Sequence, residues 1–211
     1  MIFKKYNKEG FTLVEMMVVI GIFLIVTGVI LINVPNFREK TSVDLVAQDL
    51  AVTIRSSQVF GIGTKAIGDS SVAYGVYLST EASKKGQFVL FADLPDSDGK
   101  TDLIYNPSTD GTTCGQTSTE CQSLYSLNGF NIVGINIYSN DSPNPIPLSD
   151  INISFLRPKS NPRFCTSSGN PCPEDGISKA EIIVESLKEK KQKEVVVYAN
   201  GQIAVQDVIP A

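Results

Sequence analysis

Apolar residues form one uninterrupted stretch near the start of the chain, from Phe11 to Val34, and Glu15 is its only charged residue. At a helical rise of ~1.5 Å per residue, this stretch is long enough to cross a hydrocarbon core of ~30 Å. Its many Leu, Ile, Val and Phe residues outweigh the insertion cost of one acid near a helix end, which is at most ~3 kcal/mol. The pattern therefore predicts a membrane-spanning helix over residues 11–34.

Positive charge before this helix predicts its orientation. Lys4, Lys5 and Lys8 precede the apolar stretch, and the positive-inside rule then places the N-terminus in the cytoplasm and exports the rest of the chain. A secretory signal peptide would have a shorter apolar stretch that ends at a small-residue cleavage site. Residues 36–40 offer no such site, so the pattern favours a single-pass membrane anchor.

A second, amphipathic helix is predicted over residues 35–60. Pro35 lacks an N–H and is expected to kink or interrupt the helix. Beyond it, apolar residues recur at intervals of three and four up to Val59, which is typical of a helix that packs one face on a globular domain. Gly61 and Gly63 are expected to end this helix.

After this helix, the spacing of apolar residues changes to that of β-strands, which are predicted to form an exported head over residues 62–211. The predicted strands cover residues 72–79, 87–92, 102–106, 130–138, 151–156, 180–186, 194–199 and 202–208, which are rich in β-branched and aromatic residues. Asn200-Gly201 predicts a tight hairpin between the last two. No second helix in the head is indicated. The expected fold is α+β: a long N-terminal helix, half in the membrane and half amphipathic, packed on an antiparallel β-sandwich-like head.

Composition excludes several classes of function. The 211 residues include no histidine, so a Ser-His-Asp or Cys-His catalytic site cannot form within this chain. The net charge of −4 disfavours bulk attraction to nucleic acid. We expect no enzymatic activity and no cofactor.

The segment from Lys8 to Glu15, KEGFTLVE, resembles the cleavage and methylation signal of type IV prepilins and pseudopilins. The resemblance implies that a prepilin peptidase removes a leader of residues 1–10 by cutting between Gly10 and Phe11. The same enzyme would then N-methylate the new Phe11 amine. It also implies a partner for the Glu15 carboxylate, namely the Phe11 amine of the same or a neighbouring subunit, because an unpaired acid in a helix bundle is strongly penalised.

The family resemblance implies a structural role. The chain would be a subunit of a type IV-like filament, assembled through its N-terminal helix with other pilin or pseudopilin subunits on an inner-membrane platform. Its head is expected to be most similar to H-type minor pseudopilins, as found in type II secretion. The alternatives are a major pilin, a minor pilin that binds DNA for uptake, and an anchored exported domain unrelated to filaments.

Four cysteines lie in two loops, as the pairs Cys114/Cys121 and Cys165/Cys172. The spacing is too wide for typical zinc ligands, and no histidine completes a mixed site. An exported domain meets an oxidising environment. Local disulfides are therefore favoured among the three pairings that four cysteines allow, and each would order a loop rich in small polar residues.

Two charged clusters in the head are candidate binding sites. The first contains Asp93, Asp96, Asp98 and Asp102 around a Gly turn, which resembles half of a calcium loop but lacks further expected acids. An acidic hairpin turn is the favoured interpretation. The second contains Lys188, Lys190, Lys191 and Lys193, which could contact phosphates of DNA. Neighbouring glutamates favour a solvated turn instead.

Overall fold

The computed structural model describes residues 10–63, 66–67, 70–95, 101–107, 114–115, 119–167 and 176–208. The chain divides into two compact units, residues 1–40 and residues 41–211, and each is described by itself. The first contains the N-terminal part of one long helix, and the second contains the rest of that helix with two antiparallel β-sheets. The predicted α+β fold is confirmed.

The helix, α1 (Leu13–Ile62), has 50 residues and includes Pro35. The helix continues through this proline, so of the expected kink or interruption, the interruption is wrong. Proline fixes φ near the helical value and removes only one main-chain donor, so a long helix can accommodate it. At the other end, the N–H of Gly63 donates to the carbonyl oxygen of Val59 over 2.9 Å. The helix therefore ends at the pair of glycines that the sequence indicated, with Gly61 inside its last turn.

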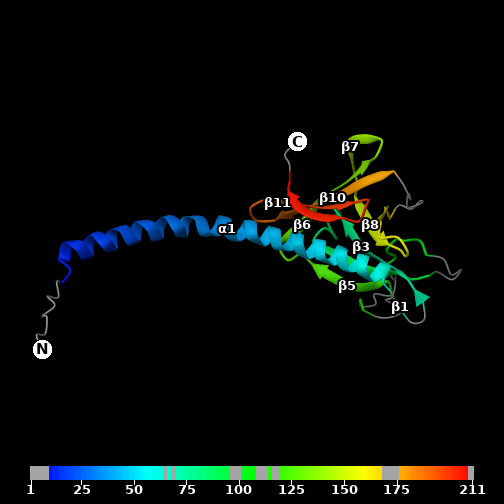
Figure 1. The fold of residues 1–211 in the computed structure, drawn as a ribbon, viewed down its shortest axis with the longest axis horizontal. Coiled ribbons are helices and arrows are strands. Elements are labelled where there is room, and N and C mark those ends of the chain that lie inside the picture. The colour runs from blue at the N-terminus through cyan, green and yellow to red at the C-terminus, as the bar shows by residue number, and fades with distance from the viewer. Residues whose placement is uncertain are drawn as a thin grey trace, which may run out of the picture. The chain divides into compact units, whose positions relative to one another are not determined.

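Within the second unit, α1 buries one face as the apolar spacing predicted. Val43, Ala47, Leu50 and Ile54 are all 1% exposed or less, and steps of four, three and four residues place them on one side of a helix. Gln48 and Arg55 lie on the exposed side, as expected. The helix is thus an integral part of the hydrophobic core of the head (Figure 1).

Two five-stranded sheets complete the head, and all their pairings are antiparallel. The first has the strand order β12-β11-β10-β6-β7, where β6 is Phe130–Ser139, β7 is Ser142–Pro147, β10 is Ile177–Ser186, β11 is Gln192–Tyr198 and β12 is Ile203–Asp207. The second has the order β5-β4-β3-β8-β9, where β3 is Ala73–Ser79, β4 is Gln87–Asp93, β5 is Cys121–Ser126, β8 is Asp150–Phe155 and β9 is Arg163–Cys165. A short hairpin pairs β1 (Ala66–Ile67) with β2 (Ser70–Ser71).

The two sheets and the helix share one core. Leu50 and Ile54 of α1 belong to the same buried cluster as Leu78 of β3 and Ile132 and Val195 of the other sheet. Alternate residues of each strand point into this core, and the others face outward. The head is therefore sandwich-like, with α1 as the third component of its interior.

The predicted strand over residues 102–106 is wrong. This segment is irregular, and its main-chain N–H groups donate to side chains rather than to a neighbouring strand. Leu103 also has a positive φ of 63°, which breaks the extended conformation. The other seven predicted strands correspond to β3, β4, β6, β8, β10, β11 and β12.

Sequence reasoning missed the outer strands. β5 and β9 are the edges of the second sheet, and β7 is one edge of the first. Three of the six residues of β7 are proline, which is tolerated at a sheet edge but not in its centre. Strands of this kind have neither the apolar/polar alternation of a half-buried strand nor the continuous apolar run of a buried one.

The hairpin at Asn200-Gly201 is confirmed. Gly201 has a φ of +85°, and the turn brings Val197 of β11 opposite Ile203 of β12. The side-chain amide of Gln58 donates to the carbonyl oxygen of Gly201 and to that of Ser160, at 3.1 Å each. The turn is therefore tied directly to the helix.

Candidate processing and assembly site

The expected cleavage point lies in the irregular segment that precedes α1. Gly10, Phe11 and Thr12 have no regular secondary structure, and the Phe11 side chain is 80% exposed. A Cβ placed on Gly10 would meet no other atom within 4 Å, so this glycine is not required by packing within the chain. The bond between Gly10 and Phe11 is accessible in the structure. Leader residues 1–9 lie outside the described residues.

Glu15 takes part in a capping box at the start of α1. The main-chain N–H of Glu15 donates to the Thr12 hydroxyl over 3.2 Å, and the main-chain N–H of Thr12 donates to the Glu15 carboxylate over 3.3 Å. This reciprocal arrangement satisfies two main-chain donors that the first turn of a helix leaves without partners. Thr12-x-x-Glu15 has the spacing of a capping box, which the sequence analysis did not predict.

The capping box gives Glu15 favourable interactions within its own helix. A carboxylate in the first turn interacts favourably with the positive end of the helix dipole, and it bonds locally to Thr12. Glu15 therefore has a structural role in the unprocessed chain. That role does not require another subunit, so any part in assembly has to be separated from it by experiment.

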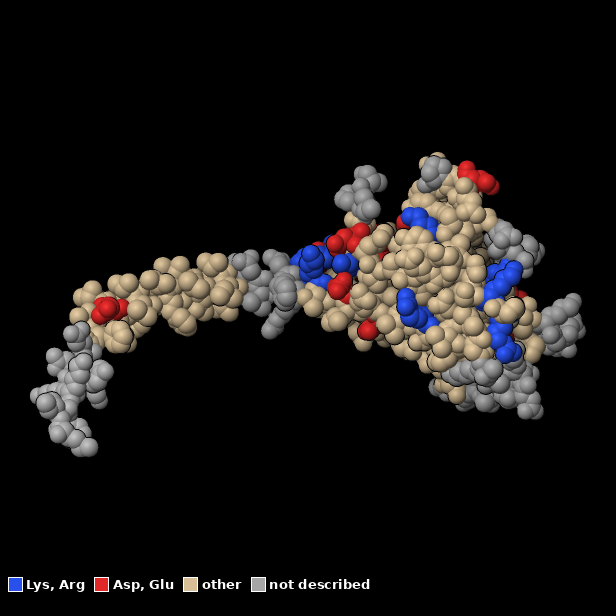
Figure 2. Space-filling model, in the orientation of Figure 1, with Lys and Arg blue, Asp and Glu red and all other residues tan. Residues whose placement is uncertain are grey.

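The segment after Glu15 is apolar on all sides. Leu13–Leu31 is long and apolar enough to cross a membrane, with a mean hydropathy of 2.7, and none of it is buried within the structure. On the face that Figure 2 shows, this part of the chain carries a single patch of acidic atoms, and Glu15 is its only charged residue. A helix that is apolar all round is typical of a membrane span or of a position among other helices.

The cysteines follow the local pattern in the part that is described. Cys114 and Cys121 form a disulfide, which joins the segment before β5 to the first residue of that strand. Cys165 in β9 is also disulfide-bonded, and Cys172 lies outside the described residues. The first disulfide packs against Tyr77 and Phe91 on the outer face of the second sheet.

The acidic cluster is only partly within the described residues, because Asp96 and Asp98 lie outside them. Asp93 is buried at the end of β4, and one of its carboxylate oxygens accepts the N–H of Leu103 over 2.9 Å. Burial raises the pKa of Asp93 to about 6, with a smaller contribution from Asp102. Among the described residues, no three acids, cysteines or histidines gather as metal ligands would. A calcium site at Asp93, Asp96, Asp98 and Asp102 gains no support.

The lysines of the β10–β11 turn are largely neutralised by acids. Lys190 lies 3.0 Å from Glu185, and Lys191 lies 2.9 Å from Glu189. Lys193 is bound on two sides, 3.2 Å from Asp44 of α1 and 2.9 Å from Asp207 of β12. Only Lys188 forms no ion pair within the described part of the chain. Ion-paired lysines make poor phosphate contacts, so the arrangement favours a structural turn over a DNA-binding surface.

Comparison with known proteins bears on the first of these sites. Residues 5–31 match the family model described as the prokaryotic N-terminal methylation motif. The match includes Gly10, Phe11, the capping box and the apolar segment up to Leu31. Neither the curated proteins nor the solved structures contain a match to the chain.

The match concerns the N-terminal segment, and its meaning agrees with the structure there. The motif lies across the accessible Gly10–Phe11 bond and the apolar part of α1, and a motif of this kind belongs to structural subunits rather than enzymes. Together they fit a single-pass, membrane-anchored protein with an exported head. The methylation motif supports a type IV pilin-like family for this chain and fits a subunit that prepilin peptidase processes and that assembles with other pilin subunits.

Proposed function

We propose that this chain is a structural subunit of a type IV-like filament, cut between Gly10 and Phe11, N-methylated at Phe11 and assembled through α1. One observation carries the proposal: the methylation motif coincides with an accessible Gly-Phe bond directly before a long apolar helix. In this proposal the leader lies in the cytoplasm, the apolar part of α1 lies in the inner membrane, and the head is exported. The subunit carries out no catalysis of its own.

Processing is tested by the mass of the N-terminal peptide of protein extracted from membranes. We expect a chain that begins at N-methylated Phe11. Gly10→Val should block cleavage, because the peptidase must approach the main chain closely, and the substitution disturbs nothing in the chain itself. Gly21→Val is the matched control, since a Cβ at Gly21 also meets no other atom within 4 Å. A wild-type chain that keeps residues 1–10 in a host with an active prepilin peptidase would refute the proposal.

Cleavage would give Glu15 a second possible partner. The new positive amine would lie at Phe11, directly before the capping residue Thr12. In a bundle of apolar helices with a low dielectric constant, this amine and a carboxylate of a neighbouring subunit would attract strongly. We propose that Glu15 exchanges its local bond to Thr12 for this pair during assembly, and that the pair sets the register between subunits.

Two variants separate the charge from the cap. Glu15→Gln removes the charge but keeps the capping box, because glutamine serves at this position as well as glutamate. Thr12→Ala removes the cap, at a cost of about 1 kcal/mol of helix stability, and keeps the charge. We expect Glu15→Gln to be processed but absent from sheared filaments, whereas Thr12→Ala is processed and assembled. Loss of assembly in Thr12→Ala alone would assign the role of Glu15 to helix capping.

We further propose a minor subunit of the H-type pseudopilin kind rather than a major pilin. A major pilin usually ends in a disulfide loop, whereas here β12 follows the last cysteine pair. The copy number in sheared filaments tests this. A minor subunit is expected at a few copies beside an abundant major subunit. A filament made mainly of this chain would assign it as the major pilin.

A further inference from the structure

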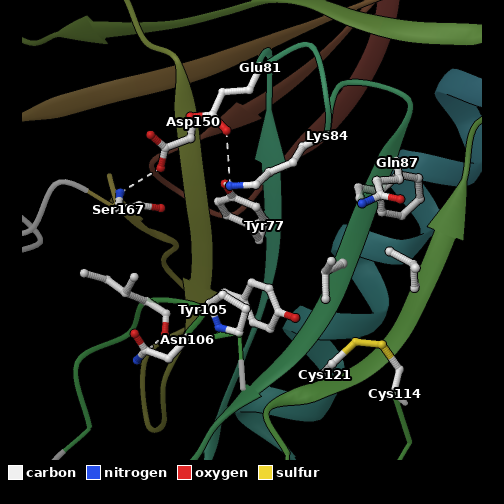
Figure 3. A pocket seen from close by; sticks show the side chains of 15 residues that line it. Tyr77, Glu81, Lys84, Gln87, Tyr105, Asn106, Cys114, Cys121, Asp150 and Ser167 are labelled. Atoms are coloured by element: carbon white, nitrogen blue, oxygen red, sulfur yellow. Dashed lines mark hydrogen bonds and ion pairs between the residues drawn. A yellow bond between two sulfur atoms is a disulfide. The ribbon is translucent and has the colours of Figure 1, made fainter. Parts of the chain in front are cut away.

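A cavity of about 470 Å³ lies on the outer face of the second sheet (Figure 3). Tyr77 of β3, Val89 of β4 and Leu124 of β5 form its floor, and the register of the sheet places them side by side in one row. Their sequence neighbours Val76, Leu78 and Leu90 belong to the main core, and Phe88 belongs to that core and also contributes to the lining of the cavity. The cavity therefore lies on the side of the sheet away from most of the main core, and its size is typical of sites for small molecules.

One wall of the cavity is the irregular segment 101–107. The N–H of Leu103 donates to Asp93, and the N–H of Tyr105 donates to the Asn152 side chain over 3.0 Å. The hydroxyl of Ser154 donates to the Leu103 carbonyl oxygen over 2.8 Å. These bonds fix the segment to strands β4 and β8. The wall is thus preformed, which lowers the entropy cost of binding a ligand.

The aromatic surface in the cavity comes from two tyrosines. The rings of Tyr77 and Tyr105 have centroids 5.5 Å apart and are tilted by 39° to one another. In Figure 3 the Tyr105 side chain extends between the floor and the wall, and Lys84 lies above the Tyr77 ring. An aromatic face of this kind offers a flat, polarisable contact to the apolar side of a ligand.

The charges around the cavity disfavour an ionic ligand. Among the described residues that line the cavity, Lys84 is the only basic one, and its ammonium lies 3.2 Å from the Glu81 carboxylate. Asp150 adds a second acid, so this described lining offers no unpaired positive charge to attract an anion. A cation is also disfavoured, because the Lys84 ammonium already lies 5.8 Å from the centre of the Tyr77 ring. A neutral ligand is the class that remains.

Polar groups of the lining that make no hydrogen bond within the described residues indicate which neutral ligands fit the cavity. Within the described part of the chain, the side-chain amide of Gln87 and the hydroxyl of Tyr105 make no hydrogen bond, and both groups line the cavity. An amide and a phenol each offer donors as well as acceptors. A purely apolar ligand would leave them desolvated and unpaired, which is costly. Hydroxyl groups of a ligand can both donate hydrogen bonds to these groups and accept hydrogen bonds from them.

We propose that this cavity binds a neutral sugar. A pyranose ring has an apolar C–H face that fits the Tyr105 ring and an edge of hydroxyl groups that fits the Gln87 amide and the Tyr105 hydroxyl. The lining supplies few anchoring bonds to a ligand of this size, so the expected dissociation constant of a monosaccharide is on the order of millimolar. The inference rests on no step of the proposed filament function, since it concerns only the outer face of the second sheet.

The test is binding of neutral sugars to the full chain in a detergent without a sugar headgroup. The probes are methyl glucoside, methyl galactoside, methyl mannoside and N-acetylglucosamine, followed by saturation-transfer NMR. Tyrosine fluorescence gives a second readout, because the chain contains no tryptophan. Inorganic phosphate and tetramethylammonium serve as the anionic and cationic probes.

Two matched pairs of variants locate the site. Gln87→Ala and Tyr105→Phe each remove one hydrogen-bonding group and should weaken binding by about threefold to tenfold. Gln48→Ala on the exposed side of α1 and Tyr125→Phe on β5 remove the same groups elsewhere and should leave binding unchanged. Thermal unfolding of each variant checks that the head is intact.

Saturable binding of at least one sugar, weakened by both cavity variants and by neither control, would support the proposal. Three results would overturn it. One is the absence of binding by every sugar at about 50 mM, well above the expected dissociation constant. The second is sugar binding that Gln87→Ala and Tyr105→Phe leave unchanged. The third is tighter binding of phosphate or tetramethylammonium than of any sugar.

Discussion

The buried carboxylate of Asp93 makes the stability of the head depend on pH. Asp93 is 1% exposed at the end of β4, and within the described residues its Oδ1 has no hydrogen-bond partner. Burial disfavours the charged form and raises the pKa of this carboxyl from 3.8 to about 6. Glu120, beside the same irregular segment, has its pKa raised to about 7, mainly by burial and further by the negative charges of Asp93 and Asp102.

The sign of the effect follows from which state holds the proton more tightly. Each acid has a higher pKa in the folded state than in the unfolded state, so the folded state binds more protons between those values. The contribution of these two acids to stability is therefore fully present below about pH 4, is lost as the pH rises to about 6 and 7, and is constant above. For Asp93, the rise from 3.8 to about 6 corresponds to about 3 kcal/mol. Solvent screening reduces this to on the order of 2 kcal/mol.

Asp93→Asn isolates this contribution. The carboxamide keeps an acceptor for the Leu103 N–H and is neutral at every pH, as the protonated acid is. We expect the variant to lose much of the fall in stability between about pH 4.5 and pH 8, and to be more stable than the wild type at the alkaline end. The assay is urea unfolding of the full chain in detergent, followed by tyrosine fluorescence across that range.

The chain suits this experiment because it contains no histidine, the residue that normally titrates in the same window. Asp141→Asn, at an exposed turn after β6, is the matched control and should retain the wild-type slope. An unchanged slope in Asp93→Asn would refute the assignment to this carboxyl. A wild-type stability that rises with pH through this window would refute the whole argument from burial.

Three further predictions concern packing and cross-links. Gly61→Ala should destabilise the head by about 1–3 kcal/mol, because a Cβ there would clash with a main-chain carbonyl of β8; a shift in urea midpoint measures it, and an unchanged midpoint would contradict it. Loss of the Cys114–Cys121 disulfide through a double serine variant should cost about 2.5 kcal/mol, and the loss should vanish when both proteins are compared under reducing conditions. Lys193→Met should cost about 1 kcal/mol through its ion pairs, and a double-mutant cycle with Asp44→Asn should show coupling between the two that high salt weakens.

Much of the fold could be predicted from the sequence because the buried elements carry clear periods. The spacing of Val43, Leu50 and Ile54 indicated the buried face of α1, and seven strands of β-branched and aromatic residues were found at their places. Asn200-Gly201 indicated its hairpin because a type of turn with positive φ demands such residues. In these cases local preference and tertiary packing favour the same structure.

The segment 101–107 could not be predicted, because its conformation is set by partners that are distant in sequence. Its N–H groups bond to Asp93, Glu120 and Asn152, and nothing in the residues themselves indicates those acceptors. The same holds for the cavity, which combines residues from four strands and three loops. The edge strands were missed for a different reason, since β5, β7 and β9 are short and polar or proline-rich and carry neither alternation nor a continuous apolar run.

The N-terminal motif could be recognised from the sequence, whereas the hydrogen bonds that Glu15 makes at the start of α1 were not predicted. The motif from Lys8 to Glu15 identified the expected cleavage point, and its position agrees with the family match. The Thr12-x-x-Glu15 spacing also indicates a capping box. The free-energy cost of placing a carboxylate in a membrane suggested that Glu15 has a charged partner. In the structure the same side chain makes local hydrogen bonds with Thr12.

The prolines of β7 have a consequence for molecules crowded together. An edge strand normally presents a row of N–H and C=O groups to which another chain can add. In β7, Pro143, Pro145 and Pro147 leave half of the six main-chain nitrogens of the strand without a hydrogen to donate, at one border of the first sheet. A neighbouring head therefore cannot extend that sheet, and edge-to-edge aggregation is suppressed on this side. Many copies anchored in one membrane plane can thus stay separate and soluble at a high local concentration.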